Sequence, residues 1–332
     1  LALAWAPDKA AGLTYLGLLG TMLAVFAATA VAGLTRRRLV VFGATMVVAY
    51  VIILGVSGVE AVFGLRLPTS RLAEDAGSQY FAVTSVFHNQ NDLATYLAIC
   101  WPFLLGVAFF TRKARWLVLA LALALPAAFA FVRTGSRSSL LAAGIATVAL
   151  LAVVAQPGSW LRTRRASLLG GILALALFVA AGYLLFNDSS DPMLRQFRLE
   201  ALLEDITEGS GSGSIRSELY RRGLAIAGES LLLGAGPGQA PGLLTGGTSG
   251  IRLGNLHNWW LELYAEGGLP GLLLHLTFVF GLLWGLLRRA RAPGDPLARY
   301  LATCAFAALA GFAVGALGPS RTLILVPMWI LY

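Results

Sequence analysis

Charged residues are scarce in this chain and cysteine is almost absent. Only 12% of the 332 residues are Asp, Glu, Lys or Arg, against about 25% in an ordinary soluble domain. With 58% hydrophobic residues and a mean hydropathy of +0.76, a soluble fold would lack the polar side chains to cover its surface. The two cysteines, Cys100 and Cys304, lie inside apolar runs, so neither a disulfide framework nor a zinc site is indicated. The composition predicts a polytopic membrane protein.

Several catalytic motifs are also missing. The sequence contains no Walker A motif, no HExxH, no CxxC and no Asp-x-Asp pair. The run 234–238, Gly-Ala-Gly-Pro-Gly, holds a GxGxG string but follows no predicted strand, so a dinucleotide site is not expected. These absences disfavour an ATP-driven pump and a nucleotide-sugar transferase that holds a diphosphate through a metal.

Eight apolar runs are long enough to cross a bilayer, for which about 17 to 25 helical residues are needed. They cover residues 13–34, 39–59, 93–111, 116–132, 138–155, 168–186, 268–287 and 298–318. A ninth run begins at Leu323 and is too short to span before Tyr332. The chain opens at Leu1 on a run already in progress, so we expect it to be part of a larger bundle.

Basic residues cluster in every second loop, which places all the clusters on one side of the membrane. The clusters are Arg36 to Arg38, Arg112 with Lys113 and Arg115, Arg162 with Arg164 and Arg165, and Arg288 with Arg289, Arg291 and Arg299. They hold 13 of the 25 basic residues and one acidic residue, Asp295. The positive-inside rule makes this side cytoplasmic. The net charge of +9 is therefore mostly a topological feature, and the expected partner is the lipid bilayer and not nucleic acid.

Three regions follow from these spans. Residues 1–186 form N-terminal transmembrane helices, about six spans. Residues 187–257 form a large extracytoplasmic loop. Residues 258–332 form C-terminal transmembrane helices, with two spans and the start of a third. The predicted fold class is an all-α polytopic integral membrane protein.

The large loop is expected to have structure of its own. Apolar residues at helical spacing predict one amphipathic helix over 195–206 and a second over 215–229, separated by a flexible Gly-Ser stretch at 209–214. Because long structured loops tend to carry function, the working face is expected to be external.

Arginines on the external side need a reason, because charge near the apolar slab is costly. Arg133 and Arg137 bracket the turn between the fourth and fifth spans. They either reach to lipid headgroups or, beside Ser136 and Ser138, form a phosphate site.

The second loop helix carries three more external arginines. Glu218 can pair with Arg221 or Arg222 at helical spacing. Arg216 has no acidic residue three or four positions downstream and shares the face of Tyr220, which makes it the better candidate for a ligand contact.

His257 stands where the large loop re-enters the membrane, and a neutral imidazole is a competent general base. A structural role for a single histidine is the alternative. Trp259, Trp260 and Tyr264 fit an interfacial aromatic belt or a sugar-stacking platform. Glu262 and Glu266 fit metal binding, orientation of a base, or capping of a helix break at 267–268.

Two other histidines and three polar residues complete the candidates. His275 is expected to pack toward the bundle within the seventh span. His88 precedes Asn89, Asn91 and Asp92, which resemble partly helix caps and partly sugar-binding polar groups.

Four stretches, in this order, resemble the O-antigen ligase and polymerase superfamily. They are Asn-Gln-Asn-Asp-Leu-Ala-Thr-Tyr-Leu from Asn89, Thr-Gly-Ser-Arg-Ser-Ser-Leu-Leu from Thr134, Arg216 followed by Leu-Leu-Gly-Ala-Gly-Pro-Gly from Leu232, and His257-Asn with Leu261, Glu266, Gly268 and Gly271. The likeness runs from about residue 80 to the C-terminus, and its Asn-Gln-Asn-Asp version is most similar to the teichuronic acid polymerase branch. The chain is short for this family.

The resemblance implies a GT-C-like multi-helix bundle in the bacterial cytoplasmic membrane, acting as an inverting glycosyltransferase without metal or other cofactor. Its donor would be a glycan on undecaprenyl diphosphate, and its acceptor a glycan or lipid-glycan. By position, Arg137 and Arg216 would hold the diphosphate and His257 would be the base. The residues implied as further substrate contacts are Arg133, Arg222, Arg321, Asn89, Asn91, Tyr220, Asn258 and Glu266. A transporter or flippase of the same lipid is the alternative function.

Overall fold

The computed structural model describes residues 2–32, 35–73, 82–111, 113–155, 212–230, 232–245, 255–317 and 322–332, with the backbone alone for residue 32 and residues 212–216. Every long element in these ranges is a helix, and none of the described residues forms a strand. The predicted all-α polytopic fold class is confirmed.

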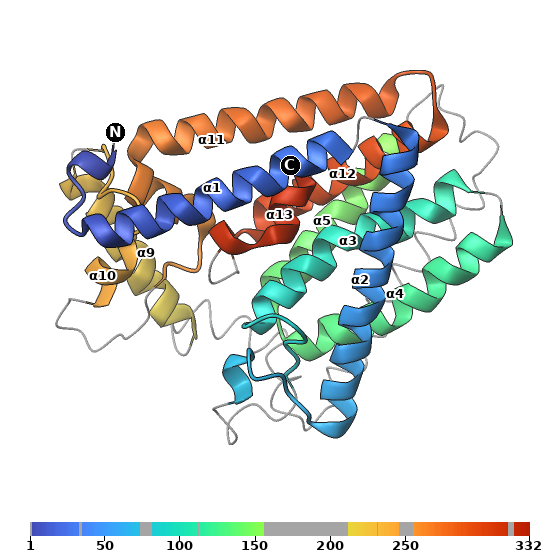
Figure 1. Ribbon diagram of the computed structural model, residues 1–332, viewed down its shortest axis with the longest axis horizontal. Coiled ribbons are helices and arrows are strands. Elements are labelled where there is room, and N and C mark those ends of the chain that lie inside the picture. The colour runs from blue at the N-terminus through green and yellow to red at the C-terminus, as the bar shows by residue number, and fades with distance from the viewer. Residues whose placement is uncertain are drawn as a thin grey trace.

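Seven described helices are long and apolar enough to cross a membrane (Figure 1). They are α1 (Lys9–Ala32), α2 (Arg36–Phe63), α3 (Gln90–Phe110), α4 (Ala114–Thr134), α5 (Arg137–Val154), α11 (Trp259–Arg291) and α12 (Pro296–Gly315). They correspond to seven of the eight predicted spans. The predicted span at 168–186 and the predicted amphipathic helix at 195–206 lie outside the described residues.

Shorter elements complete the described chain. They are η1 (Ala2–Ala4), η2 (Arg71–Ala73), α9 (Ser212–Glu229), α10 (Ala240–Thr245), η4 (Thr322–Ile324) and α13 (Val326–Leu331). The predicted second loop helix, 215–229, is therefore present as α9 but begins three residues earlier. Residues 212–214 were expected to be flexible, and that expectation is wrong, because extending a helix that is already formed gains one hydrogen bond for each residue added.

Helices α3, α5 and α12 form the centre of the bundle, and small residues allow them to approach closely. A Cβ atom on Gly311 of α12 would meet the backbone oxygen of Ala142 and the Cβ atom of Ala146 on α5. Gly315 lies against Ala142 as well. Small residues at such contacts are typical of membrane bundles, where van der Waals packing and not water exclusion drives helix association.

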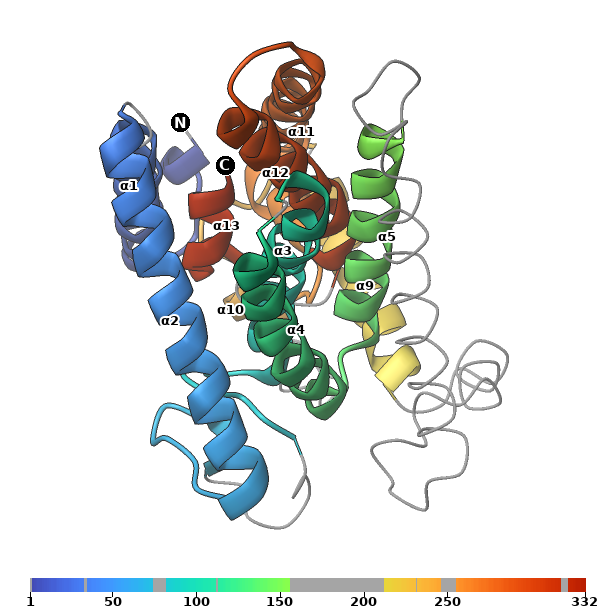
Figure 2. The same cartoon turned by 90° about the vertical axis from the view of Figure 1, so that its right-hand side faces the viewer.

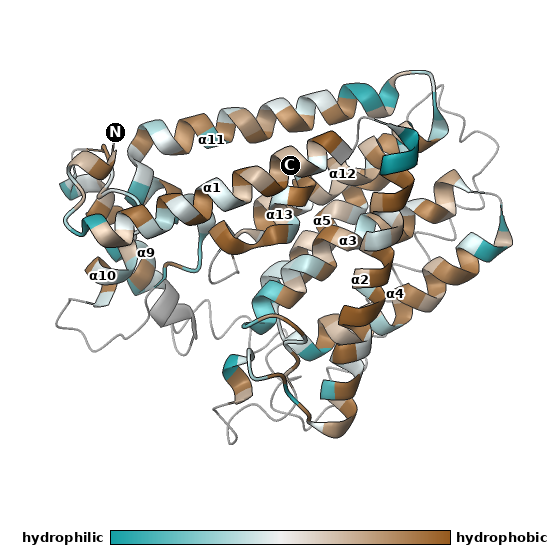
Figure 3. Ribbon diagram, viewed as in Figure 1, coloured by the Kyte–Doolittle hydropathy of each residue, from teal (hydrophilic) through white to brown (hydrophobic). Residues whose placement is uncertain are grey.

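The outer helices expose apolar side chains, as expected of surfaces that face lipid (Figure 3). On α2, Val41 and Val62 are exposed, and on α11 Leu274 and Trp284 are exposed. Figure 2 shows α3, α12 and α13 between α1 and α2 on one side and α5 on the other. The apolar composition of the chain therefore serves its outer surface as well as its core.

The basic clusters lie together at one end of the bundle. The first turn of α2, the start of α4 and the last turn of α11 appear as hydrophilic ends on the right of Figure 3. Arg36 to Arg38, Lys113 with Arg115, and Arg288 to Arg291 belong to these ends. The alternation inferred from the sequence is thus present in the fold, and the predicted cluster at 162–165 lies outside the described residues.

Helix α11 is not one straight rod. Gly268 has φ 65° and ψ −170°, a conformation that is not helical, and Pro270 follows it two residues later. The expected span began at residue 268, which is where the break falls. Trp259–Gly267 and the part after Gly268 are therefore two helical pieces with different directions.

The close contact between α5 and α12 can be tested by replacing Gly311 with alanine. We expect Gly311→Ala to lower the stability of the detergent-solubilised protein by about 1–3 kcal/mol, because the added methyl group overpacks the interface. Thermal unfolding measures the change. Gly144→Ala on α5 is the matched control, since its Cβ atom would have nothing within 4 Å, and an equal loss in both variants would contradict the packing argument.

Candidate active site

His257 lies just before α11 in a backbone conformation that two asparagines stabilise. Its φ angle is 49°, in the left-handed region that residues other than glycine adopt infrequently. The His257 amide donates to Asn255 Oδ1 at 3.1 Å. Asn258 is the N-cap of α11, and its Oδ1 accepts from the Leu261 amide at 3.2 Å. The candidate base is therefore half-buried on a defined turn.

The start of α11 is attached to the end of α12. The Trp259 amide donates to the carbonyl of Ala316 at 2.9 Å, and the Trp260 indole donates to the carbonyl of Ala313 at 2.8 Å. Through these bonds, the turn that carries His257 is held beside the last residues of α12.

Arg137 lies at the same end of the bundle. It is the first residue of α5 and follows the N-cap Ser136, which makes no side-chain cap bond. Gly135, with a φ of 66°, ends α4 just before this N-cap. Because Gly315 of α12 contacts Ala142 of α5, the end of α12 adjoins both the first turns of α5 and the His257 turn. A helix N-terminus with an arginine favours an anion.

Arg133 belongs to the last turn of α4, across the same turn from Arg137. Its guanidinium lies 5.9 Å from the centre of the Phe129 ring, and its carbonyl accepts from the Val83 amide at 3.2 Å. Ser136 Oγ donates to Ser139 Oγ at 3.0 Å. The turn between α4 and α5 thus carries an arginine on each side, with the Ser136 and Ser139 hydroxyls beside them.

Helix α9 is packed onto the segment that carries His257. Leu219 and Gly223 of α9 lie in one cluster with Leu256 and Leu261. Tyr220 packs against the same cluster. Arg216 is one turn before Leu219 in α9, and its side chain is outside the described residues.

Glu218 pairs with both arginines that follow it on α9. It accepts from Arg221 Nε at 2.8 Å and from Arg222 Nε at 2.8 Å, which confirms the pairing expected from their spacing. Hydrogen bonds from Arg221 and then Arg222 lower the pKa of Glu218 to about 2. Arg222 also donates to the carbonyl of Leu244 at 3.0 Å, so it joins α9 to α10.

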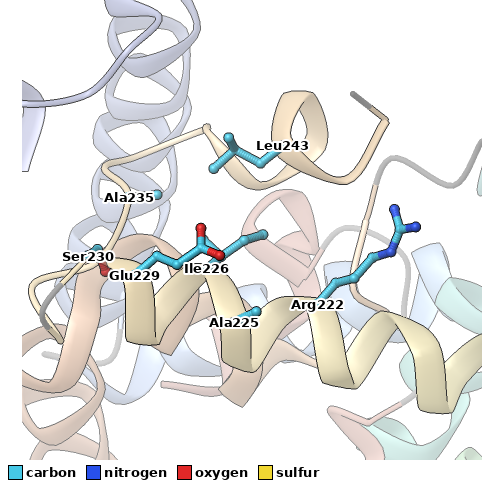
Figure 4. A pocket seen from close by; sticks show the side chains of 7 residues that line it. All are labelled: Arg222, Ala225, Ile226, Glu229, Ser230, Ala235 and Leu243. Atoms are coloured by element: carbon cyan, nitrogen blue, oxygen red, sulfur yellow. The ribbon is translucent and has the colours of Figure 1, made fainter. Parts of the chain in front are cut away.

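A cavity of about 410 Å³ opens between α9, α10 and the loop that joins them (Figure 4). Its lining residues are Arg222, Ala225, Ile226, Glu229, Ser230, Ala235 and Leu243. Arg222 and Glu229 supply the charged groups of this lining. The cavity belongs to the same packed unit of α9 and α10 that adjoins the His257 segment.

Asn89 caps α3, and Asn91 lies in the first turn of that helix. Asn89 is buried, and its Oδ1 accepts from the Asn91 amide at 2.9 Å. The Asn91 carbonyl accepts from Thr95 Oγ1 at 2.8 Å. For Asn89 the geometry supports the capping interpretation, and the sugar-binding interpretation of Asn91 stays a prediction. Arg321, the remaining candidate, lies outside the described residues.

Glu266 connects the break in α11 to the glycine-rich run. Its carboxylate accepts from the amides of Gly238 at 2.9 Å and Ala240 at 3.1 Å, and the Tyr15 hydroxyl hydrogen-bonds to it. With only 4% of Glu266 exposed, the geometry favours an architectural role over direct contact with substrate.

Backbone contacts join the same two segments, which we call the glycine clamp: residues 232–240 and residues 265–269. The Ala235 and Gly236 amides donate to the carbonyls of Ala265 and Glu266 at 2.8 and 3.0 Å, and the Leu269 amide donates to the carbonyl of Leu232 at 2.8 Å. A Cβ atom on Gly234 would collide with the backbone of residues 266–268. The glycines of the GxGxG run therefore allow two backbone segments to pack closely.

The N-terminal segment is fastened to the glycine clamp. The Trp5 indole donates to the carbonyl of Gly234 at 2.8 Å. Asp8 and Gln239 bond reciprocally, since the Asp8 amide donates to Gln239 Oε1 at 2.9 Å and Gln239 Nε2 donates to the Asp8 carbonyl at 2.8 Å. No local pattern in the sequence predicts a pair of residues so far apart, and sequence reasoning missed it.

Among the described residues, no three His, Cys, Asp or Glu side chains gather into a group that could hold a metal ion. The Glu262 and Glu266 pair considered for metal is thus not joined by a third such ligand within the described ranges.

Comparison with known proteins identifies a matching family and a relative. The sequence profile of the O-antigen ligase family matches residues 119–276. The chain is also 25% identical, over 337 residues, to teichuronic acid biosynthesis protein TuaE of Bacillus subtilis, an alignment that covers 99% of this chain and 67% of that protein. The resemblance to the O-antigen ligase and polymerase superfamily is confirmed.

The family match includes most of the candidate site. It begins within α4, ends within α11, and contains Arg133, Arg137, Arg216, Arg222 and His257. Together with the helix pattern, it indicates a membrane enzyme that transfers glycan.

The break at Gly268 can be tested by adding one methyl group. Gly268→Ala should destabilise the protein by about 1–3 kcal/mol, because an L-residue is strained at this φ and ψ and its Cβ atom would collide with the backbone of residues 232–233. Gly267→Ala is the matched control, since its Cβ atom would have nothing within 4 Å. Thermal unfolding in detergent measures both, and equal stability of the two variants would contradict the clamp.

The carboxylate in the glycine clamp gives an independent test. Glu266→Gln should cost about 1–3 kcal/mol, because one of the two amides would face an NH₂ group in place of an oxygen and stay unsatisfied. Glu229→Gln, at an exposed carboxylate on α9, should leave the unfolding temperature unchanged. A Glu266→Gln protein as stable as the wild type would refute the architectural role.

Proposed function

We propose that the protein transfers glycan from an undecaprenyl-diphosphate-linked donor to an acceptor hydroxyl at the extracytoplasmic face of the bacterial cytoplasmic membrane, with inversion and without a metal. The observation that carries the proposal is the placement of the His257 turn and the start of α5, with Arg137, beside the same end of α12. A base and an anion-binding group are what such a transfer needs from the protein.

His257 would act as the general base. The acceptor hydroxyl gives its proton to the imidazole while its oxygen attacks the anomeric carbon of the donor. The bond between that carbon and the diphosphate oxygen breaks, and the lipid diphosphate leaves with the electron pair. A single displacement from the face opposite the leaving group inverts the anomeric centre.

Arg137 and Arg216 would stabilise the leaving diphosphate. The negative charge on the diphosphate grows as the bond breaks, and fixed guanidiniums aimed at it lower the barrier more than they favour the bound donor. The N-terminus of α5 adds its partial positive charge at the position of Arg137. Arg133, Arg222 and Arg321 would supply further contacts to donor or acceptor, with Asn91 and Tyr220.

The extracytoplasmic location is supported by the charge distribution. The described basic clusters lie at the opposite ends of α4 and α11 from Arg133 and the His257 turn. By the positive-inside rule, the clustered end faces the cytoplasm and the candidate site faces outward. The acceptor would then be another lipid-linked glycan in a polymerase, or a different glycan carrier in a ligase.

Turnover by the purified protein tests the proposal. Incubation with a short glycan on undecaprenyl diphosphate should give elongated or transferred glycan and release the lipid diphosphate. We expect His257→Ala, Arg137→Ala and Arg216→Ala each to lower the rate at least a hundredfold while the protein elutes as a folded species in detergent.

Arg221→Ala is the matched control for the arginine variants. Arg221 lies on α9 like Arg216, but its side chain is 73% exposed and paired with Glu218, so its loss should leave turnover unchanged. Undiminished turnover in His257→Ala would refute the base assignment. Movement of the intact donor across the membrane of proteoliposomes without any glycan transfer would show that the protein is a transporter and not a glycosyltransferase.

A further inference from the structure

The inference concerns His275, a residue of the membrane-embedded part of α11. Its imidazole Nε2 lies 3.2 Å from Trp259 Nε1. Sixteen residues of straight helix would separate the two Cα atoms by about 24 Å. The contact therefore exists only because α11 breaks at Gly268 and its first piece folds back along the second.

The hydrogen bond from the Trp259 indole identifies which ring nitrogen of His275 carries the proton. An indole N–H donates and cannot accept, so His275 Nε2 is the acceptor and the ring proton lies on Nδ1. The Tyr332 hydroxyl is 3.1 Å from the same Nε2, and it can donate to that nitrogen too. His275 is thus neutral, and the single lone pair of its Nε2 accepts from the Trp259 indole with the Tyr332 hydroxyl as a neighbouring donor.

Aromatic rings surround this acceptor. The ring centres of Trp259, Trp260 and Tyr332 lie 5.7, 5.8 and 5.7 Å from that of His275, and Phe278 lies at 6.2 Å. Trp259 is only 2% exposed. The expectation that His275 packs toward the bundle is confirmed. The aromatic rings around His275 also leave the buried Trp259 indole little freedom to rotate.

Trp259 is two residues from His257. Its amide is bound to Ala316 and its indole to His275, so both ends of this residue are fixed. The residue between them, Asn258, caps the helix that Trp259 begins. The orientation of the His257 turn is therefore determined from two sides, by α12 and by the later part of α11.

We propose that His275 is a positioning residue for His257: by accepting the Trp259 indole N–H, it holds the first piece of α11 at the angle that presents His257 to the acceptor hydroxyl. His275 itself touches no substrate. This inference rests on the proposed function, since it assigns His257 the role of base.

Three variants test the inference in the glycan-transfer assay. His275→Leu removes the acceptor and should lower kcat at least tenfold, with the KM for the lipid-linked donor changed less than twofold. His275→Gln places an amide oxygen near the position of Nε2 and should recover at least a third of wild-type kcat. Trp259→Phe removes the donor and should match His275→Leu.

The double variant Trp259→Phe/His275→Leu should be no slower than the slower single variant, because both changes break one hydrogen bond. Thr277→Val, at an exposed position two residues further along α11, is the control and should keep full turnover. If His275→Leu does not fold, the kcat of His275→Gln and the kcat of Trp259→Phe still test the positioning role.

Wild-type kcat in Trp259→Phe, failure of His275→Gln to exceed His275→Leu, or additive losses in the double variant would overturn the inference. These results are distinguishable from failure of the proposed function. An inactive His257→Ala with a fully active His275→Leu rejects only the positioning role, whereas a fully active His257→Ala rejects the base itself.

Discussion

The carboxylate of Glu266 and the backbone around Gly268 set the geometry on which the rest of the site depends. A membrane helix that breaks must find other partners for the amides and carbonyls it frees, because lipid supplies none. Here the glycine clamp supplies them: the Leu269 amide reaches Leu232, and the carbonyls of Ala265 and Glu266 accept from the loop. Once the break is stabilised in this way, Trp259 can fold back to His275, and His257 comes to stand beside α12.

Much of the bundle follows from one-dimensional information. Apolar length, basic clusters and helix caps are properties of neighbouring residues, so seven spans, the common end of the arginine clusters and the Glu218 pairs on α9 were predictable. The Gly267–Gly268 break was among the open interpretations for the same reason. The start of α9 was not, because Ser212 to Ser214 have weak helical preference and join the helix only as an extension of it.

In the candidate site, too, features set by neighbouring residues could be predicted and features set by distant contacts could not. His257 and Arg137 could be singled out because a histidine or an arginine at a loop junction is conspicuous in so apolar a chain. The hydrogen bonds of Glu266, Gln239 and His275 could not be predicted, since Glu266 and Gln239 bind distant segments and the bond between His275 and Trp259 depends on the break in α11. The glycine run illustrates the limit: its spacing is visible in the sequence, but its use, a close approach to the backbone of residues 266–268, is visible only in three dimensions.

The bonds between the N-terminal segment and the glycine clamp have a consequence for biogenesis. Asp8 is made first, yet its partner Gln239 follows 231 residues later. At about 5–20 residues per second, the ribosome needs on the order of tens of seconds to reach it. During that interval Trp5 and Asp8 have no clamp to bind, and α1, which has few buried residues of its own, is held mainly by lipid. Helix α1 is therefore synthesised well before the contacts that fix its N-terminal end exist.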